Sequence, residues 1–266
     1  MERKRTVQDG PVEDIFLSGS LIGMSTVSAL PQRNMNTMVM HNFGLISGGI
    51  NDFFGIDVGA TVRLGIDYGL TDKLDIGIGR TSRENMVDLR LKYLLLQQLK
   101  SDKVPFQIAL KGDIGINTER ENRFDFTFKE RLNFLGSVMI ARKFNNQFSL
   151  QLAPMISHFN TVVLENSTDE LNHTIFGIGI GGRYKWSQRN SVAFEYLPVI
   201  GERNLGTKNH AAVSYEIDTG GHVFQIFLMS GQWFTEQHLL ARTDTNISDL
   251  EFRIGFNINR LFSLGK

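Results

Sequence analysis

The stretch from Asp57 to Gln98 constrains the fold most, because apolar residues alternate there with polar residues or glycine almost without interruption. The run Val87-Asp-Leu-Arg-Leu-Lys-Tyr-Leu94 has this pattern in its simplest form. A period of two is typical of β-strands whose two faces differ chemically. Because much of the remaining chain repeats this unit, the sequence predicts an all-β fold.

The spacing of the strand candidates indicates a closed up-and-down arrangement. The candidates cover residues 35–46, 57–70, 73–82, 86–98, 105–118, 129–144, 147–159, 173–186, 191–200, 210–219, 222–233 and 248–262. Tight turns at 71–72, 100–103, 145–146, 187–190 and 220–221 alternate with longer links at 47–56, 119–128, 160–172, 201–209 and 234–247, and only the link 83–85 departs from this. Short turns at one rim and longer loops at the other are typical of bacterial outer-membrane barrels. No stretch carries a sustained helical period.

The chemistry of the two strand faces predicts that the apolar face meets lipid. The polar face is rich in glycine, which relieves crowding inside a barrel but only weakens an outer, water-facing surface. Several strands are longer than the roughly 9–11 residues that cross a bilayer at a tilt. Aromatic residues near the tight turns predict an interfacial girdle. Its members are Tyr68, Phe106, Phe144, Phe148, Tyr184, Trp186, Phe194, Tyr215, Phe224 and Phe262. We therefore predict a transmembrane antiparallel β-barrel of about 12 strands.

The N-terminal region does not fit the barrel pattern. Bacterial single-chain barrels have an even number of strands, and a further strand at 21–29 would make the number odd. We therefore predict an extension at residues 1–33, lying in the periplasm or folded into the lumen, before a barrel at 34–266 with both termini periplasmic. The basic start Met1-Glu-Arg-Lys-Arg5 is followed by Glu13 and Asp14 instead of a continuous apolar region. We read no intact signal peptide and expect a mature or trimmed chain.

Composition excludes several kinds of function. The chain has no cysteine, which rules out disulfide frameworks, thiolate metal sites and cysteine nucleophiles. Its 28 basic and 28 acidic residues cancel, so no bulk charge favours nucleic acid. No apolar run approaches the roughly 20 residues of a membrane helix.

Several short motifs, in their order along the chain, resemble an uncharacterised family of outer-membrane barrels from Bacteroidetes-type bacteria. They include His41-Asn-Phe-Gly44, Phe53-Phe-Gly-Ile-Asp57, Tyr68-Gly-Leu-Thr-Asp72, Gly79-Arg-Thr-Ser82, Ile140-Ala-Arg-Lys-Phe144, Gly181-Gly-Arg-Tyr184 and Asp218-Thr-Gly-Gly-His-Val-Phe-Gln225. The resemblance spans roughly residues 20–262. It implies a membrane location and a barrel fold, and it implies no reaction or ligand.

The lumen face carries many charged residues of both signs. They are Arg63, Asp67, Asp75, Asp88, Arg90, Lys92, Lys111, Asp113, Arg183, Lys185, Glu195, Glu216, Asp218, Glu251 and Arg253. Rings of one sign would indicate a selective pore. Here the signs are mixed within strands, as in Asp88-Leu-Arg90, which favours a mutually neutralising network because buried charges need partners.

Catalytic, cofactor and metal sites are not predicted. The six histidines lack metal-ligand spacing. The nearest candidate for a lipid hydrolase is His158 with Ser157, but adjacent residues of a strand point to opposite faces. The glycine-rich run Gly177-Ile-Gly-Ile-Gly-Gly182 is not followed by a helix, so it lacks the geometry of a phosphate-binding loop.

The sequence therefore predicts a non-catalytic protein of the bacterial outer membrane. We expect a structural or accessory component of an envelope assembly. The main alternative is a narrow channel for small polar solutes or ions, and the second is an outer-membrane lipid-modifying enzyme. Expected partners are outer-membrane lipid and other outer-membrane or periplasmic proteins, with no cofactor and no nucleic acid.

Overall fold

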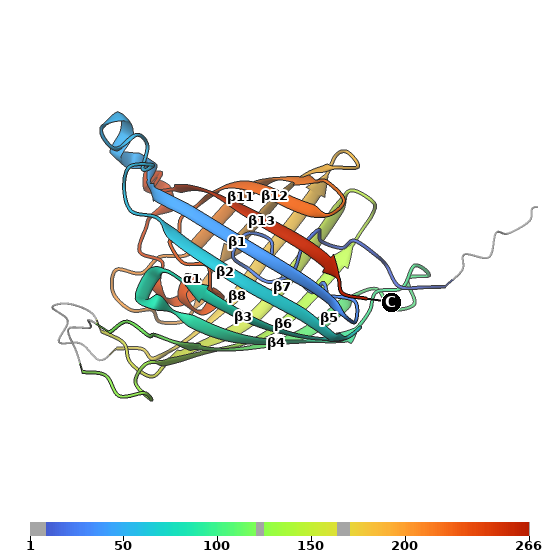
Figure 1. Ribbon diagram of the computed structural model, residues 1–266, viewed down its shortest axis with the longest axis horizontal. Coiled ribbons are helices and arrows are strands. Elements are labelled where there is room, and N and C mark those ends of the chain that lie inside the picture. The colour runs from blue at the N-terminus through green and yellow to red at the C-terminus, as the bar shows by residue number, and fades with distance from the viewer. Residues whose placement is uncertain (1–8, 121–124, 164–170, 266) are drawn as a thin grey trace, which may run out of the picture.

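The computed structural model describes residues 9–120, 125–163 and 171–265, and these form one antiparallel β-barrel (Figure 1). The strands are β1 (Asn34–Leu45), β2 (Thr61–Thr71), β3 (Leu74–Thr81), β4 (Val87–Leu96), β5 (Gln107–Ile116), β6 (Leu132–Lys143), β7 (Phe148–Phe159), β8 (Thr174–Lys185), β9 (Asn190–Leu197), β10 (Val199–Ile200), β11 (His210–Asp218), β12 (His222–Met229) and β13 (Arg253–Ser263).

Strand pairing closes the sheet on itself. Each strand pairs with its neighbour in sequence, and β1 pairs with β13 from Asn34 opposite Ser263 to Leu45 opposite Arg253. The short β10 continues β9 after Pro198, and both pair with β8. Counting β9 and β10 as one strand gives twelve, so the prediction of a barrel of about 12 strands is confirmed.

The two ends of the barrel differ in their connections. At one end, which we call the turn end, the links after β2, β6, β8 and β11 are short, although the link 97–106 is longer than the predicted turn at 100–103. At the other end, the loop end, lie the links 46–60, 82–86, 117–131, 160–173, 201–209 and 230–252. This asymmetry agrees with the predicted alternation of turns and loops.

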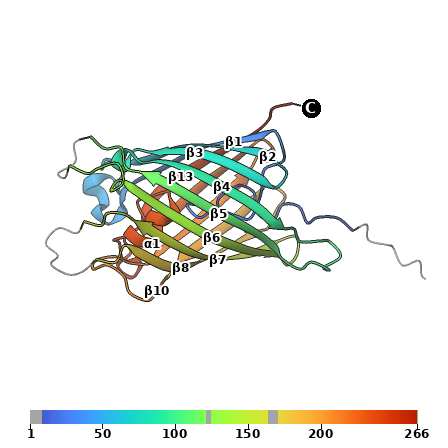
Figure 2. The same cartoon turned by 90° about the horizontal axis from the view of Figure 1, so that it is seen from below.

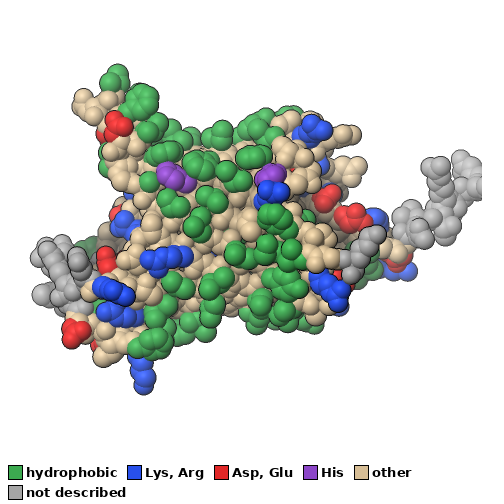
Figure 3. Space-filling view, viewed as in Figure 1, with side chains coloured by type: hydrophobic (Ala, Val, Ile, Leu, Met, Phe, Trp, Pro, Cys, Tyr) green, Lys and Arg blue, Asp and Glu red, His purple; other side chains and the backbone are tan. Residues whose placement is uncertain are grey.

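The outward face of the barrel wall is apolar. Leu64, Ile78, Leu89 and Ile226 are each exposed by half or more of their area. Hydrophobic side chains cover the barrel surface in Figure 3, and most charged side chains gather toward its two ends. Such a belt is the surface that lipid would cover.

The inward face makes room for large groups through glycine. A Cβ atom on Gly181 would lie 2.2 Å from Leu21 Cδ1, and one on Gly79 would lie 2.3 Å from a guanidinium nitrogen of Arg63. Both contacts are shorter than atoms tolerate, so the missing side chains leave space for neighbours that fill the lumen.

Short helices lie in the loop-end links, and one of them corrects a prediction. The helix α1 (Glu236–Arg242) occupies part of the link 234–247, for which the sequence predicted no helix. The 3-10 segments η1 (Ile46–Asp52), η2 (Arg83–Asn85) and η3 (Ile247–Asp249) lie in other parts of these links. In the described part of the chain, no helix has the length and apolar character needed to cross a membrane.

Two predicted strands also begin later than expected. The strand predicted at 57–70 starts at Thr61, and the one predicted at 248–262 starts at Arg253. Leu250 has a φ of +58°, which no β-strand accommodates, so the chain turns there before entering β13.

Candidate functional site

Residues 15–30 enter the lumen and form a segment that we call the plug. The chain approaches at the turn end, where the amide of Val12 donates to the carbonyl of Gln98 at 2.7 Å. It returns to the same end, where the amide of Gln32 donates to Asp72 at 2.9 Å. Figure 2 shows the segment inside the barrel. Leu21, Ile22, Met24 and Val27 are almost completely buried, so the plug packs against the wall as a protein core does.

The tip of the plug is held by one carboxylate. Glu195, on β9, accepts the backbone N–H groups of Ile22, Gly23 and Met24 at 2.9–3.0 Å. It also lies 3.0 Å from Nε2 of His210. Hydrogen bonds to a charged acceptor are stronger than neutral ones, and Glu195 is 1% exposed. This contact explains how a short segment without regular structure is fixed inside the lumen.

Amide side chains of the wall hold further parts of the plug, and near its end Asp75 accepts the amide of Leu30 and Lys92 donates to the carbonyl of Ser28. Gln151 accepts the amide of Val27 at 2.9 Å and donates to the carbonyl of Ser25 at 2.7 Å. Gln107 donates to the carbonyl of Val27 at 3.1 Å, and Asn257 donates to that of Ile22 at 3.1 Å. Gln225 donates to the carbonyl of Leu21. We call Gln107, Gln151, Glu195, Gln225 and Asn257 the plug seat.

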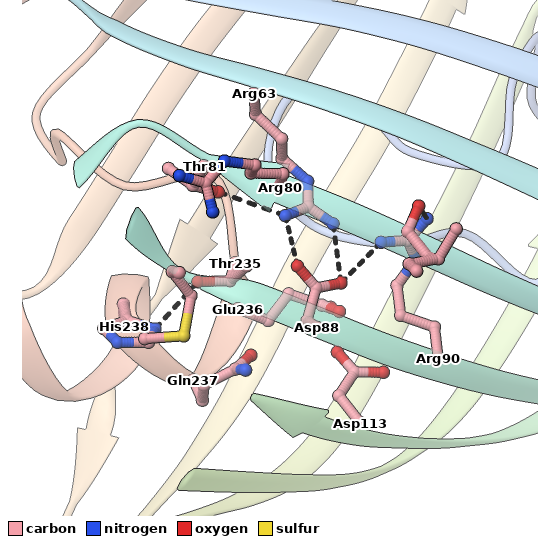
Figure 4. Close-up of polar contacts among 12 residues, drawn as sticks. Arg63, Arg80, Thr81, Asp88, Arg90, Asp113, Thr235, Glu236, Gln237 and His238 are labelled. Atoms are coloured by element: carbon pink, nitrogen blue, oxygen red, sulfur yellow. Dashed lines mark hydrogen bonds and ion pairs between the residues drawn. The ribbon is translucent and has the colours of Figure 1, made fainter. Parts of the chain in front are cut away.

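The opposite side of the lumen holds a chain of ion pairs that we call the charge ladder. Asp88 on β4 accepts from Arg63 on β2 at 2.8 Å and from Arg90, which lies on its own strand. Arg90 also pairs with Asp67 at 2.7 Å. Figure 4 shows Asp88 between the two guanidinium groups. These four side chains neutralise one another without help from the plug.

A three-way contact joins the plug, the wall and α1. Glu236, the first residue of α1, accepts the amide of Ser25 at 3.0 Å and pairs with Lys111 on β5. Lys111 also pairs with Asp113 at 2.8 Å. The alternating pattern contains no signal for Glu236, which lies outside the strands. A capping-type Thr235 ahead of Glu236 and the apolar run Leu239-Leu-Ala241 could have indicated a short helix there.

A cavity of about 430 Å³ lies at the loop end, lined in part by α1. On one side His238 stacks on Trp233 with ring centroids 4.1 Å apart, and Thr235 Oγ1 lies 2.8 Å from His238 Nδ1. His238 Nε2 is buried and has no hydrogen-bond partner in the described part of the chain. Burial and the nearby positive charge of Arg242 hold the pKa of His238 well below its usual value, so this ring is neutral.

The predicted lumen charges fall into two groups. Eight of them meet as ion pairs, namely Arg63, Asp67, Asp75, Asp88, Arg90, Lys92, Lys111 and Asp113. Others bond to uncharged groups. Two arginines donate to backbone carbonyls, Arg183 to that of Asp14 and Arg253 to that of Ser230. Glu216 accepts from the side chains of Ser191 and Gln225. Two further carboxylates accept backbone amides, Glu251 that of Asn246 and Asp218 that of Gly220. Lys185 lies half-buried at the end of β8, and Glu195 belongs to the plug seat.

The predicted girdle residues lie on the outer face. Phe106, Phe144, Tyr184, Trp186, Phe194, Tyr215 and Phe224 are exposed, and Tyr68, Phe148 and Phe262 are half-buried. Trp186 stacks on Tyr215 and Phe144 on Phe148, in both cases with centroids 5.7 Å apart. Their contact with a membrane interface stays a prediction.

The histidines offer little for catalysis. His158 does not pair with Ser157, and its Nδ1 lies 2.8 Å from Thr174 Oγ1 on the neighbouring strand. Ser157 is buried on the lumen side. Within the ranges 9–120, 125–163 and 171–265, no group of three His, Asp or Glu residues could hold a metal ion.

Comparison with known proteins identifies one family and several porin-like structures. The family model described as "Membrane bound beta barrel domain (DUF5777)" matches residues 16–262. A search of curated proteins finds no match. Among solved structures, the NanC porin is 8% identical with a TM-score of 0.55, and the match covers 85% of this chain and 98% of that one. The KdgM porin is 7% identical with a TM-score of 0.52, and the match covers 86% of this chain and 99% of that one. The COG4313 outer membrane channel from Pseudomonas putida F1 is 15% identical with a TM-score of 0.53, and the match covers 89% of this chain and 98% of that one. At these identities the similarity shows the fold alone.

Proposed function

The chain belongs to the DUF5777 family of membrane-bound β-barrel domains and is a barrel of the bacterial outer membrane, and from this premise we propose that it is a narrow channel for small polar solutes, closed at rest by its own plug. The resemblance to a membrane barrel family is thereby confirmed, whereas an origin in Bacteroidetes-type bacteria stays a prediction. The observation that carries the proposal is the plug seat, because each of its five polar side chains bonds to a peptide group of the plug.

A wall built in this way can become wet. When peptide groups leave Glu195, Gln151 and Gln107, water or a polar solute can take their hydrogen bonds at little cost, because both offer donors and acceptors. Removal of an apolar plug from an apolar wall would leave a dry cavity instead. The chemistry of the plug seat therefore suits a path that opens for polar solutes.

The helix α1 closes the lumen from the other end. Its side chains Leu239 and Leu240 are buried, and a Cβ atom on Gly23 of the plug would lie 2.4 Å from Leu239 Cδ1. Helix and plug thus touch directly and also share Glu236. We infer that release of the plug removes the contacts that hold α1 in the lumen, so that the helix shifts with it, and that the protein is non-catalytic.

Planar-bilayer recording of the purified protein tests this function. We expect the full chain to be closed most of the time and a variant lacking residues 1–30 to conduct steadily. A matched control replaces residues 15–30 by a glycine-serine segment of equal length, which cannot fill the plug's apolar contacts and should also conduct. If neither variant conducts although circular dichroism shows that both barrels are folded, the channel is ruled out.

An accessory role in an envelope assembly is the second candidate, and one surface favours it. Residues 46–58 project from the loop end as a knob that includes η1 (Figure 1). Its Ile50 is 84% exposed, and the exposed Phe53 and Phe54 have φ values of +49° and +56°. A left-handed backbone costs a bulky residue of order 1–3 kcal/mol, and such strain clusters at functional sites.

Cross-linking in intact cells tests the accessory role. Substitution of Phe53 and Phe54 by serine should abolish any adduct formed at the knob. Phe128→Ser is the control, because Phe128 is also exposed but lies in the separate link 117–131. Equal loss with the control, or no adduct with the unaltered chain, would argue against a partner at the knob. Outer-membrane lipid around the apolar belt is the other proposed partner.

A further inference from the structure

The cavity at the loop end offers an apolar surface of a size suited to a small organic molecule. Its volume of about 430 Å³ lies within the roughly 300–1,000 Å³ typical of small-molecule sites. Leu132, Phe159, Val162, Leu205 and Ala241 are among its lining residues. Barrel strands and α1 supply the buried part of this lining, which gives the cavity a fixed floor.

His238, which lines this cavity, carries a nitrogen that has no hydrogen-bond partner among the described residues. The hydroxyl of Thr235 has one side-chain partner in the described structure, His238 Nδ1. If the hydroxyl donates to Nδ1, both atoms are satisfied, and the proton of the neutral ring sits on Nε2. The opposite arrangement would leave the hydroxyl proton and Nε2 both without partners. The favoured tautomer therefore has a buried Nε2–H group, unpaired within the described ranges, on a side chain that lines the cavity.

Asn133 supplies a second donor at the cavity floor. Its Oδ1 accepts from Gln237 at 3.1 Å, so that oxygen is occupied. Its Nδ2 meets only the sulfur of Met86, at 3.6 Å, in the part of the chain that the structure describes. Because a thioether is a weak acceptor, this N–H group can bind a better acceptor from a ligand.

Arg83 adds a positive charge beside these donors. Its guanidinium lies 5.2 Å from the Trp233 ring, the same ring on which His238 stacks. Arg242 also lies over Trp233, but it is paired with Glu84 at 2.7 Å. No carboxylate of the described residues lies within ion-pair distance of Arg83. The charges of Glu84, Asp244 and Glu119 act on Arg83 from farther away, so its guanidinium keeps free N–H groups for a ligand.

We propose that this cavity is a binding site for a small amphipathic monocarboxylate. Its carbon skeleton lies against Phe159 and Leu132, and its carboxylate accepts from His238 Nε2–H and Asn133 Nδ2 beside the charge of Arg83. These three groups are all donors, which favours a ligand with acceptor oxygens. Four acidic residues also line the cavity, namely Glu84, Glu119, Glu130 and Asp244. Glu84 is paired with Arg242 and Glu130 accepts from Thr127, and the negative charges together disfavour a ligand with more than one negative charge. This proposal does not depend on whether the barrel conducts.

Fluorescence titration of the full chain in nanodiscs tests the proposal. The chain has two tryptophans, so Trp186→Phe leaves Trp233 as the reporter. The probes are 3-phenylpropanoate and the neutral 3-phenylpropan-1-ol, which share the same skeleton. We expect the carboxylate to bind about tenfold more tightly than the alcohol, a difference of about 1.4 kcal/mol. Equal affinities, or no saturable signal with either probe, would overturn the proposal.

Two variants locate the preference for the carboxylate. Arg83→Gln should remove most of it, whereas Arg80→Gln is the control, because Arg80 bonds to Asn85 and does not line the cavity. His238→Phe keeps an aromatic ring against Trp233 but has no donor, and it should weaken carboxylate binding without changing alcohol binding. If Arg83→Gln and Arg80→Gln behave alike, the carboxylate does not sit where we place it. Arg83 is exposed, so its substitution should not prevent folding.

Discussion

Two sides of the same lumen wall are stabilised in different ways. On β2 and β4, the charges of the ladder, Arg63, Asp67, Asp88 and Arg90, neutralise one another. On β7 and β9, Gln151 and Glu195 bond instead to the backbone of the plug. Because a buried polar group needs a partner, the charge ladder is complete without the plug, whereas the plug seat depends on it. Asp75 and Lys92, beside the ladder, also bond to the plug, at Leu30 and Ser28. A barrel can thus keep one rigid wall while the other exchanges its partners.

The glycines of the wall follow the same division. Gly79 leaves space for the guanidinium of Arg63, and Gly181 leaves space for Leu21 and Met24 of the plug. Small residues therefore make room for permanent ion pairs on one side and for a removable segment on the other. Four substitutions can break or sharpen this comparison.

The largest effect on the plug should come from Glu195→Ala. The change removes three hydrogen bonds from a charged acceptor, each worth about 1.5–3 kcal/mol. Hydrogen exchange at the amides of Ile22, Gly23 and Met24 should accelerate by more than about 100-fold, measured by mass spectrometry. Glu202→Ala, at an exposed position, is the control. Unchanged exchange would mean that Glu195 does not hold the plug.

Asp88→Asn should affect the barrel instead of the plug. The loss of this charge leaves Arg63 and Arg90 without their shared carboxylate, and breaking a buried pair costs about 3–5 kcal/mol. We expect a lower denaturant midpoint for unfolding in detergent, with the exchange of plug amides unchanged. If plug exchange rises as far as in Glu195→Ala, the two sides are not independent.

Glu236→Ala should have an intermediate effect that reaches both the plug and α1. Ser25 loses its acceptor, and Lys111 keeps only Asp113. We expect faster exchange at Ser25 and in residues 236–242, together with earlier proteolytic cleavage in the link 230–252. Asp244→Ala is the control on the same link, at an exposed position. An effect confined to α1 would show that the helix and the plug are not coupled.

Gly181→Ala should have the smallest effect, about 1 kcal/mol. The new Cβ atom would meet the flexible end of Leu21, which can shift at modest cost. Plug exchange should rise slightly, whereas Gly79→Ala should leave it unchanged and lower barrel stability. If Gly79→Ala raised plug exchange and Gly181→Ala lowered only barrel stability, the plug would depend on the wall of the charge ladder instead of the wall of the plug seat.

The sequence predicted the barrel well because period two survives in every long strand. Outward residues such as Leu89 and inward ones such as Asp88 follow from the pleat alone. The mixed signs of Asp88 and Arg90 also indicated a neutralising network before their distances were known. The charge ladder was thus within reach of pattern analysis.

The plug seat and the cavity could not be predicted from the sequence, for physical reasons. Glu195 was grouped with the other lumen charges, because nothing local in β9 indicates that it binds peptide groups more than 170 residues away in sequence. The plug has no periodicity, since its backbone is satisfied by wall side chains. The helix α1 is one short element buried on nearly all sides, so it lacks the amphipathic period that would have predicted it.

A reversible tether between the plug and the wall tests the central claim most directly. In this cysteine-free chain, Leu21→Cys and Gly181→Cys place two Cβ positions within about 5 Å, close to the separation of about 3.5–4.5 Å found in disulfides. Planar-bilayer recording should detect no openings when the pair is oxidised and openings when it is reduced. The same conductance in both states, or silence in both, would contradict a lumen that opens by release of the plug.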